Sequence, residues 1–211
     1  MRKQKKNSGS LVIIMLVCSF VLIVTSCLEV TQHISMNGNV ICTNTRLAIQ
    51  KSLFILSDSF GAGVSMDDFP IDSIDDDIPK NYIKSIETID TEQEYGTSIT
   101  LEYSANDAAQ FGIGDNSFLF PTKRGNKVIL SVTPTELDYA SDSYEMMLMI
   151  FSSFKYRLYI SKTVLANPSM VTITRNDLQF NATLIAYPDF AVLELPLTVL
   201  FGDEPFQIII E

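Results

Sequence analysis

Apolar and polar residues alternate along much of the chain, with the period of two that is typical of β-strands. The first such segment, Leu28 to Ser35, places its alternate residues from Val30 to Ile34 on one face. Asn37-Gly38-Asn39 follows it, and both residue types accept the positive φ angles of tight turns. Val40 to Ile49 is therefore predicted to return as the second strand of a hairpin.

The same alternation predicts further strands. One pair is expected to be joined around Tyr95-Gly96, and another pair flanks the turn from Lys123 to Asn126. The predicted strands after the first hairpin are 86–90, 97–103, 118–120, 127–132, 156–160, 170–174, 178–187, 190–200 and 206–210.

A period near 3.6 predicts two or three helices between these strands. A short one is expected where the apolar residues Leu53, Phe54 and Leu56 follow the second strand, and it should stop at Gly61-Ala62-Gly63. Another is expected over Ile78 to Ser85, with Pro79 in its first turn. The strongest pattern is Tyr144 to Phe154, which is apolar almost all round and follows the cap residue Asp142. The predicted class is α+β: a single domain with one twisted antiparallel sheet and helices packed on one face.

The amino terminus has the pattern of a signal peptide. The basic residues from Arg2 to Lys6 precede the hydrophobic run Leu11 to Val24. A helix of that run spans about 21 Å at ~1.5 Å per residue. A bilayer core is roughly 30 Å thick, so the run is short for a permanent span and fits a secretory signal.

Val24-Thr25-Ser26-Cys27 resembles the lipobox of bacterial lipoproteins. The resemblance implies cleavage between Ser26 and Cys27 and a diacylglyceryl anchor on the Cys27 thiol. Buried acyl chains, at ~0.8 kcal/mol per CH₂, would hold a soluble domain of residues 27–211 on a membrane. The alternatives are an ordinary secretory peptide or an uncleaved anchor, in which Cys27 is incidental.

The position after the cysteine bears on location. Many enterobacterial lipoproteins retained at the inner membrane carry aspartate there, and this chain has Leu28. The expectation is an extracytoplasmic, lipid-anchored protein, on the outer membrane if the source has two.

Charge then excludes one class of partner. Four of the 15 basic residues lie in the signal segment, so residues 27–211 carry 11 basic and 25 acidic residues, a formal charge of −14. Without a surplus of Lys and Arg, no counterions would be displaced from phosphates, and a nucleic-acid partner is not expected. With 46% hydrophobic residues, the chain is expected to fold around a substantial core.

Few residues are suited to catalysis. Loss of the signal peptide and lipidation of Cys27 leave Cys42 as the one thiol, and the only histidine is His33. A buried structural cysteine is the favoured reading of Cys42, and a catalytic pair with His33 is the alternative. The chain has no Gly-x-Ser-x-Gly elbow, Walker loop or Cys-x-x-Cys pair, so no enzyme activity is expected. A carboxylate-based hydrolase remains the less favoured possibility.

Six aspartates lie within the eleven residues from Asp67 to Asp77. Their order does not match a calcium-binding loop, so a solvated acidic loop is predicted there and a cation site is the alternative. No metal ion or cofactor is expected.

The predicted 144–154 helix supplies the candidate ligand site. Tyr144, Met147, Phe151 and Phe154 lie at i, i+3, i+7 and i+10, and methionine adapts to irregular apolar ligands. Such a helix could close a cavity over a curved sheet for a lipid tail or a hydrophobic peptide. The alternative is that these side chains are ordinary core.

The layout resembles the LppM-like group of bacterial envelope lipoproteins. The matching stretches are Glu29 to Ile49, with its Asn37-Gly38 turn, and Phe154 to Ile210. The chain departs from mycobacterial members in lacking a carboxy-terminal membrane helix. The resemblance implies an α+β domain with a cavity for an apolar ligand and transfers no catalytic residue. The expected role is non-catalytic binding or scaffolding, with a lipid or protein partner, and a purely structural envelope protein is the alternative.

Overall fold

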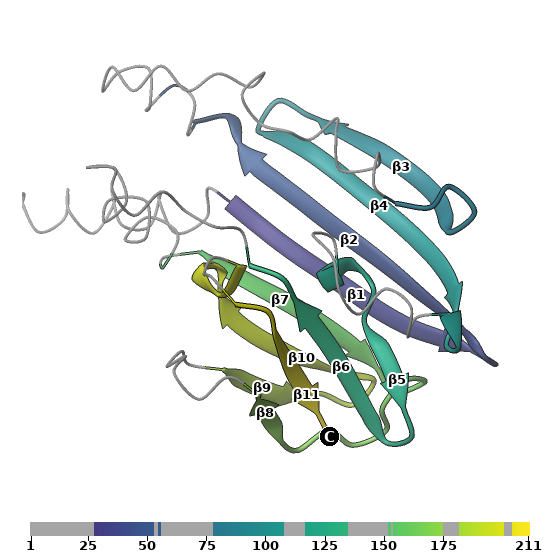
Figure 1. The fold of residues 1–211 in the computed structure, drawn as a ribbon. Helices are drawn as coiled ribbons and strands as arrows, with labels where there is room; N and C mark the ends of the chain where they lie inside the picture. The colour runs from purple at the N-terminus through teal and green to yellow at the C-terminus, as the bar shows by residue number, and fades with distance from the viewer. Residues whose placement is uncertain are drawn as a thin grey trace, which may run out of the picture.

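Two β-sheets face each other around one hydrophobic core in the computed structural model (Figure 1). The structure describes residues 28–52, 55, 78–107, 117–134, 152, 154–174, 182–200 and 204–211. The large sheet has seven strands in the order β3-β4-β2-β1-β7-β10-β9, and the small sheet has four in the order β5-β6-β11-β8. The small sheet covers the half of the large one that contains β1, β7 and β10 (Figure 1).

The strands are numbered in the order in which they occur along the chain. They are β1 (Leu28–Asn37), β2 (Val40–Gln50), β3 (Ile83–Asp90), β4 (Glu94–Ser104), β5 (Thr122–Arg124), β6 (Lys127–Val132), β7 (Lys155–Ser161), β8 (Val171–Ile173), β9 (Thr183–Ala186), β10 (Phe190–Pro196) and β11 (Phe206–Ile210). Two short 3₁₀ segments accompany them, η4 (Ser117–Leu119) and η5 (Leu197–Leu200).

The predicted α+β class is wrong. Among the described residues no helix reaches seven residues, and strands make up most of the structure. The inner face of the large sheet is covered by a second sheet, so it does not need the helices that the sequence pattern suggested. The prediction of one antiparallel sheet is also wrong. The structure has two sheets, and β1 and β7 pair in parallel, from Val30 opposite Tyr156 to Ile34 opposite Ile160.

The helix predicted over residues 78–85 is also wrong. Pro79 begins one turn, in which the Tyr82 amide donates to its carbonyl at 2.9 Å, and β3 starts directly afterwards at Ile83. From there the backbone groups pair with β4. Pairing with β4 gives the backbone groups of β3 partners in the sheet, so tertiary contacts override the local helix signal.

The turn predicted at Tyr95-Gly96 lies four residues earlier, between Asp90 and Glu94. Gly96 sits inside β4, opposite Ala48 of β2. A Cβ at Gly96 would meet the carbonyl oxygen of Leu47 and would lie 2.8 Å from the Ala48 Cα. The glycine is therefore required for close approach of two central strands, and not for a turn.

The two predicted hairpin turns are confirmed. Gly38 and Gly125 have φ angles of 61° and 58°, which other residues adopt at a cost. The strand before the second turn is β5, and not the expected 118–120 segment, which carries η4 and a bend.

Buried polar side chains of the large sheet bind the end of η4 and the residues directly after it. The Gln32 amide donates to Thr45 Oγ1 at 3.0 Å and to the Leu119 carbonyl at 3.2 Å. The Tyr156 hydroxyl donates to Gln32 Oε1 at 2.6 Å, and the Tyr103 hydroxyl donates to the carbonyl of Pro121 at 2.8 Å. Gln32 is fully buried, and no buried side-chain polar atom of the described residues lacks a partner. A satisfied network of this kind fixes how the two layers meet.

Candidate binding surface

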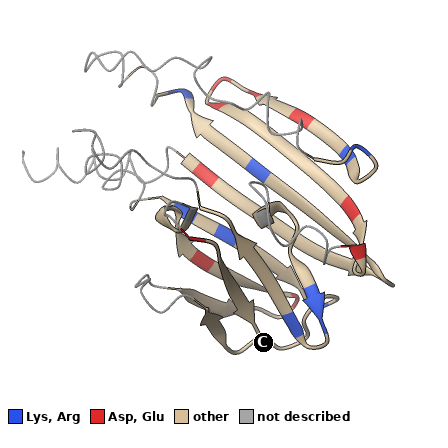
Figure 2. Ribbon diagram, viewed as in Figure 1, with Lys and Arg blue, Asp and Glu red and all other residues tan. Residues whose placement is uncertain are grey.

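The outer face of the large sheet, opposite the core, is organised in rows that cross the strands. Charged residues of both signs alternate across the sheet near the end where Leu28 begins β1 (Figure 2). Aromatic residues gather nearer the other end, where β7 ends and β10 begins. Both rows arise because every second residue of neighbouring strands points to the same face.

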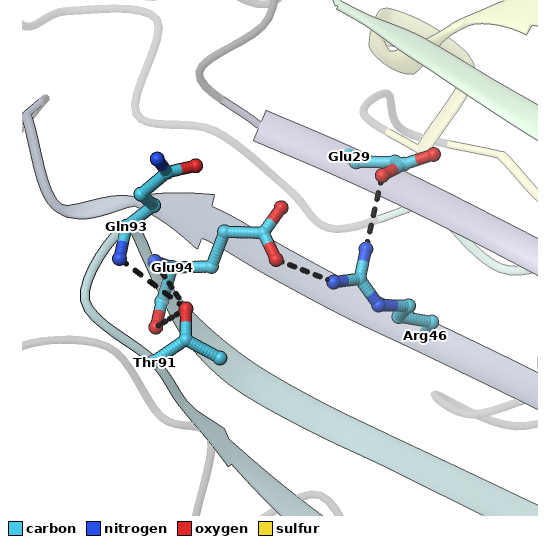
Figure 3. A network of polar contacts seen from close by, with 5 residues as sticks. All are labelled: Glu29, Arg46, Thr91, Gln93 and Glu94. Atoms are coloured by element: carbon cyan, nitrogen blue, oxygen red, sulfur yellow. Dashed lines mark hydrogen bonds and ion pairs between the residues drawn. The ribbon is translucent and has the colours of Figure 1, made fainter.

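The charged row links five adjacent strands through ion pairs. Arg46 Nη2 lies 2.7 Å from Glu94 Oε2, and its Nη1 lies 3.0 Å from Glu29 Oε2 (Figure 3). Glu29 also lies 3.9 Å from Arg157, whose Nε is 2.8 Å from Glu194. These side chains are partly exposed, so each pair contributes little to stability.

The ion pair between Arg157 and Glu194 shifts the pKa values of both groups. Hydrogen bonds from Lys155 and Arg157 lower the pKa of Glu194. The hydrogen bond to Glu194 in turn raises the pKa of Arg157. Both shifts favour the charged forms of Glu194 and Arg157, so this ion pair is stabilised at neutral pH.

The aromatic row consists of His33, Tyr159, Phe190 and Tyr187. The rings of His33 and Tyr159 are stacked at 4.3 Å and 3°, and those of Tyr187 and Phe190 are stacked at 4.8 Å and 26°. Phe190 is 36% exposed and Tyr187 is 43% exposed, and because the two rings are stacked they form one apolar patch. Contiguous exposed apolar surface of this kind marks binding sites.

A pocket of about 200 Å³ adjoins the exposed end of this row. It lies between the loop after β7 and the hairpin that joins β9 to β10. Its lining residues are Lys162, Ala166, Asn167, Pro168, Ser169, Ala186, Tyr187, Phe190 and Ala191. Lys162 is the one basic residue of this lining, and the described residues hold no acidic group in an ion pair with it.

Cys42 and His33, the two residues considered for catalysis, both lie on the outer face of the large sheet. Cys42 lies opposite Ser35, and burial raises the pKa of its thiol, so the nucleophilic thiolate is disfavoured. His33 lies opposite Asn44 and stacks on Tyr159, and burial lowers its pKa. The arrangement supplies no activated nucleophile at this position.

Most sequence-predicted site residues fall outside the described residues. Ser26 and Cys27, the residues Tyr144, Met147 and Phe151, and the acidic stretch 67–77 all lie there. Phe154 is described, and at 2% exposed it belongs to the hydrophobic core. No group of three or more potential metal ligands occurs within the part of the chain that the structure describes.

Sequence reasoning missed the residues of the pocket and its aromatic rim. Tyr187 and Phe190 lie within the run Tyr-Pro-Asp-Phe, whose proline and aspartate signal a turn between two strands. That signal could have placed both rings at a hairpin. Their proximity to His33 and Lys162 depends on strand order, which no local pattern contains.

Comparison with known proteins identifies no relative. No protein-family model matches the chain, and no curated protein matches it. The resemblance to LppM-like lipoproteins therefore stays a prediction. In the described part of the chain, no helix is long and apolar enough to cross a membrane.

Proposed function

We propose that this chain is a non-catalytic binding protein of the bacterial envelope, held to a membrane by a lipid on Cys27. The observation that carries the proposal is the pocket with its exposed aromatic rim, Tyr187 and Phe190. A concave site beside exposed aromatic side chains is the usual form of a surface that binds a ligand or partner.

The position of this surface supports the proposal. Leu28 follows Cys27 directly and begins β1, so an anchor on Cys27 holds that end of the sheet at the membrane. β7 runs parallel to β1, and the pocket residue Lys162 directly follows its last residue, Ser161. Seven residues of strand span about 23 Å at ~3.3 Å per residue. The pocket would therefore face away from the bilayer, toward a partner outside it.

The chemistry of the outer face favours binding over hydrolysis. The Cys42 thiol has a raised pKa, and the ionised Glu194 is held between Lys155 and Arg157. A general acid requires a carboxyl group that retains its proton near neutral pH, and the lowered pKa of Glu194 opposes this.

The anchor is tested by cell fractionation and intact-mass measurement. The native protein should lack residues 1–26 and carry the mass of acyl chains on Cys27. A Cys27→Ser variant should leave the membrane fraction. Retention of the first 26 residues, or an unmodified thiol in native material, would exclude the lipoprotein assignment.

The binding surface is tested by photo-crosslinking in intact cells. A photoreactive phenylalanine analogue in place of Tyr187 should give discrete adducts, whereas the same analogue in place of Glu87, on the other edge of the large sheet, should not. Equal labelling at both positions, or none at either, would favour a purely structural envelope protein.

A further inference from the structure

The two edge strands of the large sheet, as far as the structure describes the chain, differ in a way that suggests what the pocket binds. β3 forms one edge and β9 forms the other. β3 carries Lys84, Glu87 and Asp90 among its eight residues and has a register irregularity between Ile83 and Ser85. Charges and bulges are the features by which proteins prevent an edge strand from pairing with another chain.

β9 has none of these features. Its sequence is Thr-Leu-Ile-Ala, without charge, proline or irregularity, and no strand of the described residues pairs with its outer side. Ile185 is 38% exposed on the same face as the aromatic row. β8, the uncharged edge strand of the small sheet, has three residues against four in β9, and of these two strands β9 alone contributes to the pocket lining.

The hydrogen-bond pattern shows which backbone groups of β9 are available. The Tyr187 amide donates to the Phe190 carbonyl at 2.8 Å, and bonded pairs alternate in an antiparallel ladder. Ile185 and Thr183 therefore bond to β10, and the amides and carbonyls of Leu184 and Ala186 point outward. Two residues with outward groups, spaced by two, present the donor and acceptor spacing that an added strand requires.

The pocket lies at the end of this edge, since Ala186 and Tyr187 belong to its lining. Lys162 supplies a cation there, and Asn167 and Ser169 supply polar groups. Among the described residues no acidic side chain forms an ion pair with Lys162, so its ammonium group can bind an anion in the pocket.

We propose that β9 binds an extended peptide as an added strand, and that the pocket binds a carboxylate of that peptide through Lys162. The carboxylate is either the carboxy terminus of the peptide or an acidic side chain. The outward groups of Leu184 and Ala186 bind the peptide backbone, and Ile185 and Tyr187 contact its alternate side chains. This inference deepens the proposed function and rests on its claim that this end of the protein is a binding surface.

The first test uses synthetic peptides and the full-length protein in detergent micelles. Fluorescence anisotropy compares an acetylated Thr-Val-Thr-Val-Thr-Val hexapeptide that has a free carboxy terminus, its carboxamide, and a carboxamide that ends in Glu. One charge-assisted hydrogen bond predicts about tenfold tighter binding for at least one carboxylate peptide than for the plain carboxamide. Which of the two binds distinguishes a terminal from a side-chain carboxylate. Equal affinity of all three would overturn the carboxylate assignment.

Lys162→Gln is the matched protein variant. It should reduce the affinity of the carboxylate peptide to that of the carboxamide and leave carboxamide binding unchanged. A Lys80→Gln variant, at an exposed lysine before β3, should leave the preference intact. If Lys162→Gln retains the preference, the pocket does not bind the carboxylate.

Strand addition is tested on the peptide itself, which avoids dependence on the folding of a variant. N-methylation of the residues whose amides face β9 should weaken binding about tenfold or more, and methylation of the alternate residues should have little effect. Equal effects of both series would overturn strand addition. Ala186→Pro removes one outward amide and should act as the first series does, whereas Thr88→Pro on the outward side of β3 should not.

The oligomeric state tests the remaining alternative, that a second copy of the chain pairs with β9. If light scattering shows a dimer that Ala186→Pro dissociates, a second copy of the chain occupies β9 and the peptide proposal is wrong. If no peptide binds but crosslinking at position 187 still gives adducts, this inference fails while the proposed function stands.

Discussion

The two faces of the large sheet use polar residues in different ways. On the inner face, Gln32 and Tyr156 are fully buried and bonded to each other, and Gln32 also holds the carbonyl of Leu119. On the outer face, Arg46 and Glu29 form an ion pair while both remain partly exposed to water. The same strands carry both sets, because alternate residues point to opposite sides.

The difference lies in what replaces each interaction when it is lost. A buried amide or hydroxyl without a partner has no water to bond to, so its loss costs the full desolvation penalty. An exposed charge is hydrated again at once. The inner network therefore determines how the second layer docks, and the outer face can vary and carry a binding surface at little cost in stability.

The largest effect is expected for Gln32→Ala. It leaves the Tyr156 hydroxyl without its acceptor, removes one of the two donors to the Leu119 carbonyl and opens a cavity, so the free energy of unfolding should fall by about 3 kcal/mol. Urea denaturation followed by circular dichroism measures it. Replacing both partners, as Gln32→Leu with Tyr156→Phe, should recover about half of that loss. A double variant less stable than Gln32→Ala would contradict the role assigned to the network.

Gly96→Ala should cause the next largest loss in the free energy of unfolding. Here the cost comes from close backbone contact and not from the loss of a buried polar group. A methyl group there meets the backbone of Leu47 and Ala48, and the forced separation of β2 and β4 should cost about 2 kcal/mol. Thr88→Ala on the neighbouring edge strand is the control and should stay within about 0.5 kcal/mol of wild type. Equal stability of the Gly96 variant and its control would show that the two strands can separate without cost.

Arg46→Met should destabilise by less than about 1 kcal/mol at low salt, because its two ion pairs are exposed. At about 0.5 M salt the difference from wild type should shrink, since screening weakens the pairs in both states. Thermal melts of both proteins at two ionic strengths measure this difference in stability. A loss comparable to that of Gln32→Ala would abolish the distinction between the two faces.

Substitution of Glu194 should have the smallest effect on the free energy of unfolding, and this effect should depend on pH. Its pKa in the folded protein is lowered below its ordinary 4.5, so its contribution to stability is present above that value and is lost as the pH falls through the folded pKa. Glu194→Gln should therefore be slightly less stable than wild type at pH 7 and equal to it in acid. Stability measured between pH 7 and pH 3 tests this, with Glu87→Gln as a control. A difference that grows on acidification would contradict the lowered pKa.

The sequence pattern predicted the strands better than the helices. β1 and β2 were expected within two residues of their bounds, because alternation and the Asn-Gly turn agree there. The 78–85 helix was wrong because Pro79 is compatible with a single turn as well as with a helix, and only pairing with β4 decides between them. Gly96 was read as a turn because a glycine required for close approach looks the same in the sequence.

The candidate site was harder to predict, since its parts lie far apart in the chain. His33 and Tyr159 are separated by 126 residues and touch only because β1 pairs with β7. The exposure of Tyr187 and Phe190 likewise depends on which strand ends the sheet.

The amino-acid sequence alone determined the alternation of residues between the two faces of a strand and the turns at Gly38 and Gly125, because both depend on neighbours two to four positions away. Tertiary structure alone decided the order of the strands, the covering of one sheet by another, and the place of β9 at the end of the large sheet among the described residues. These depend on contacts between residues far apart in the chain, whose energies appear only when whole layers pack together.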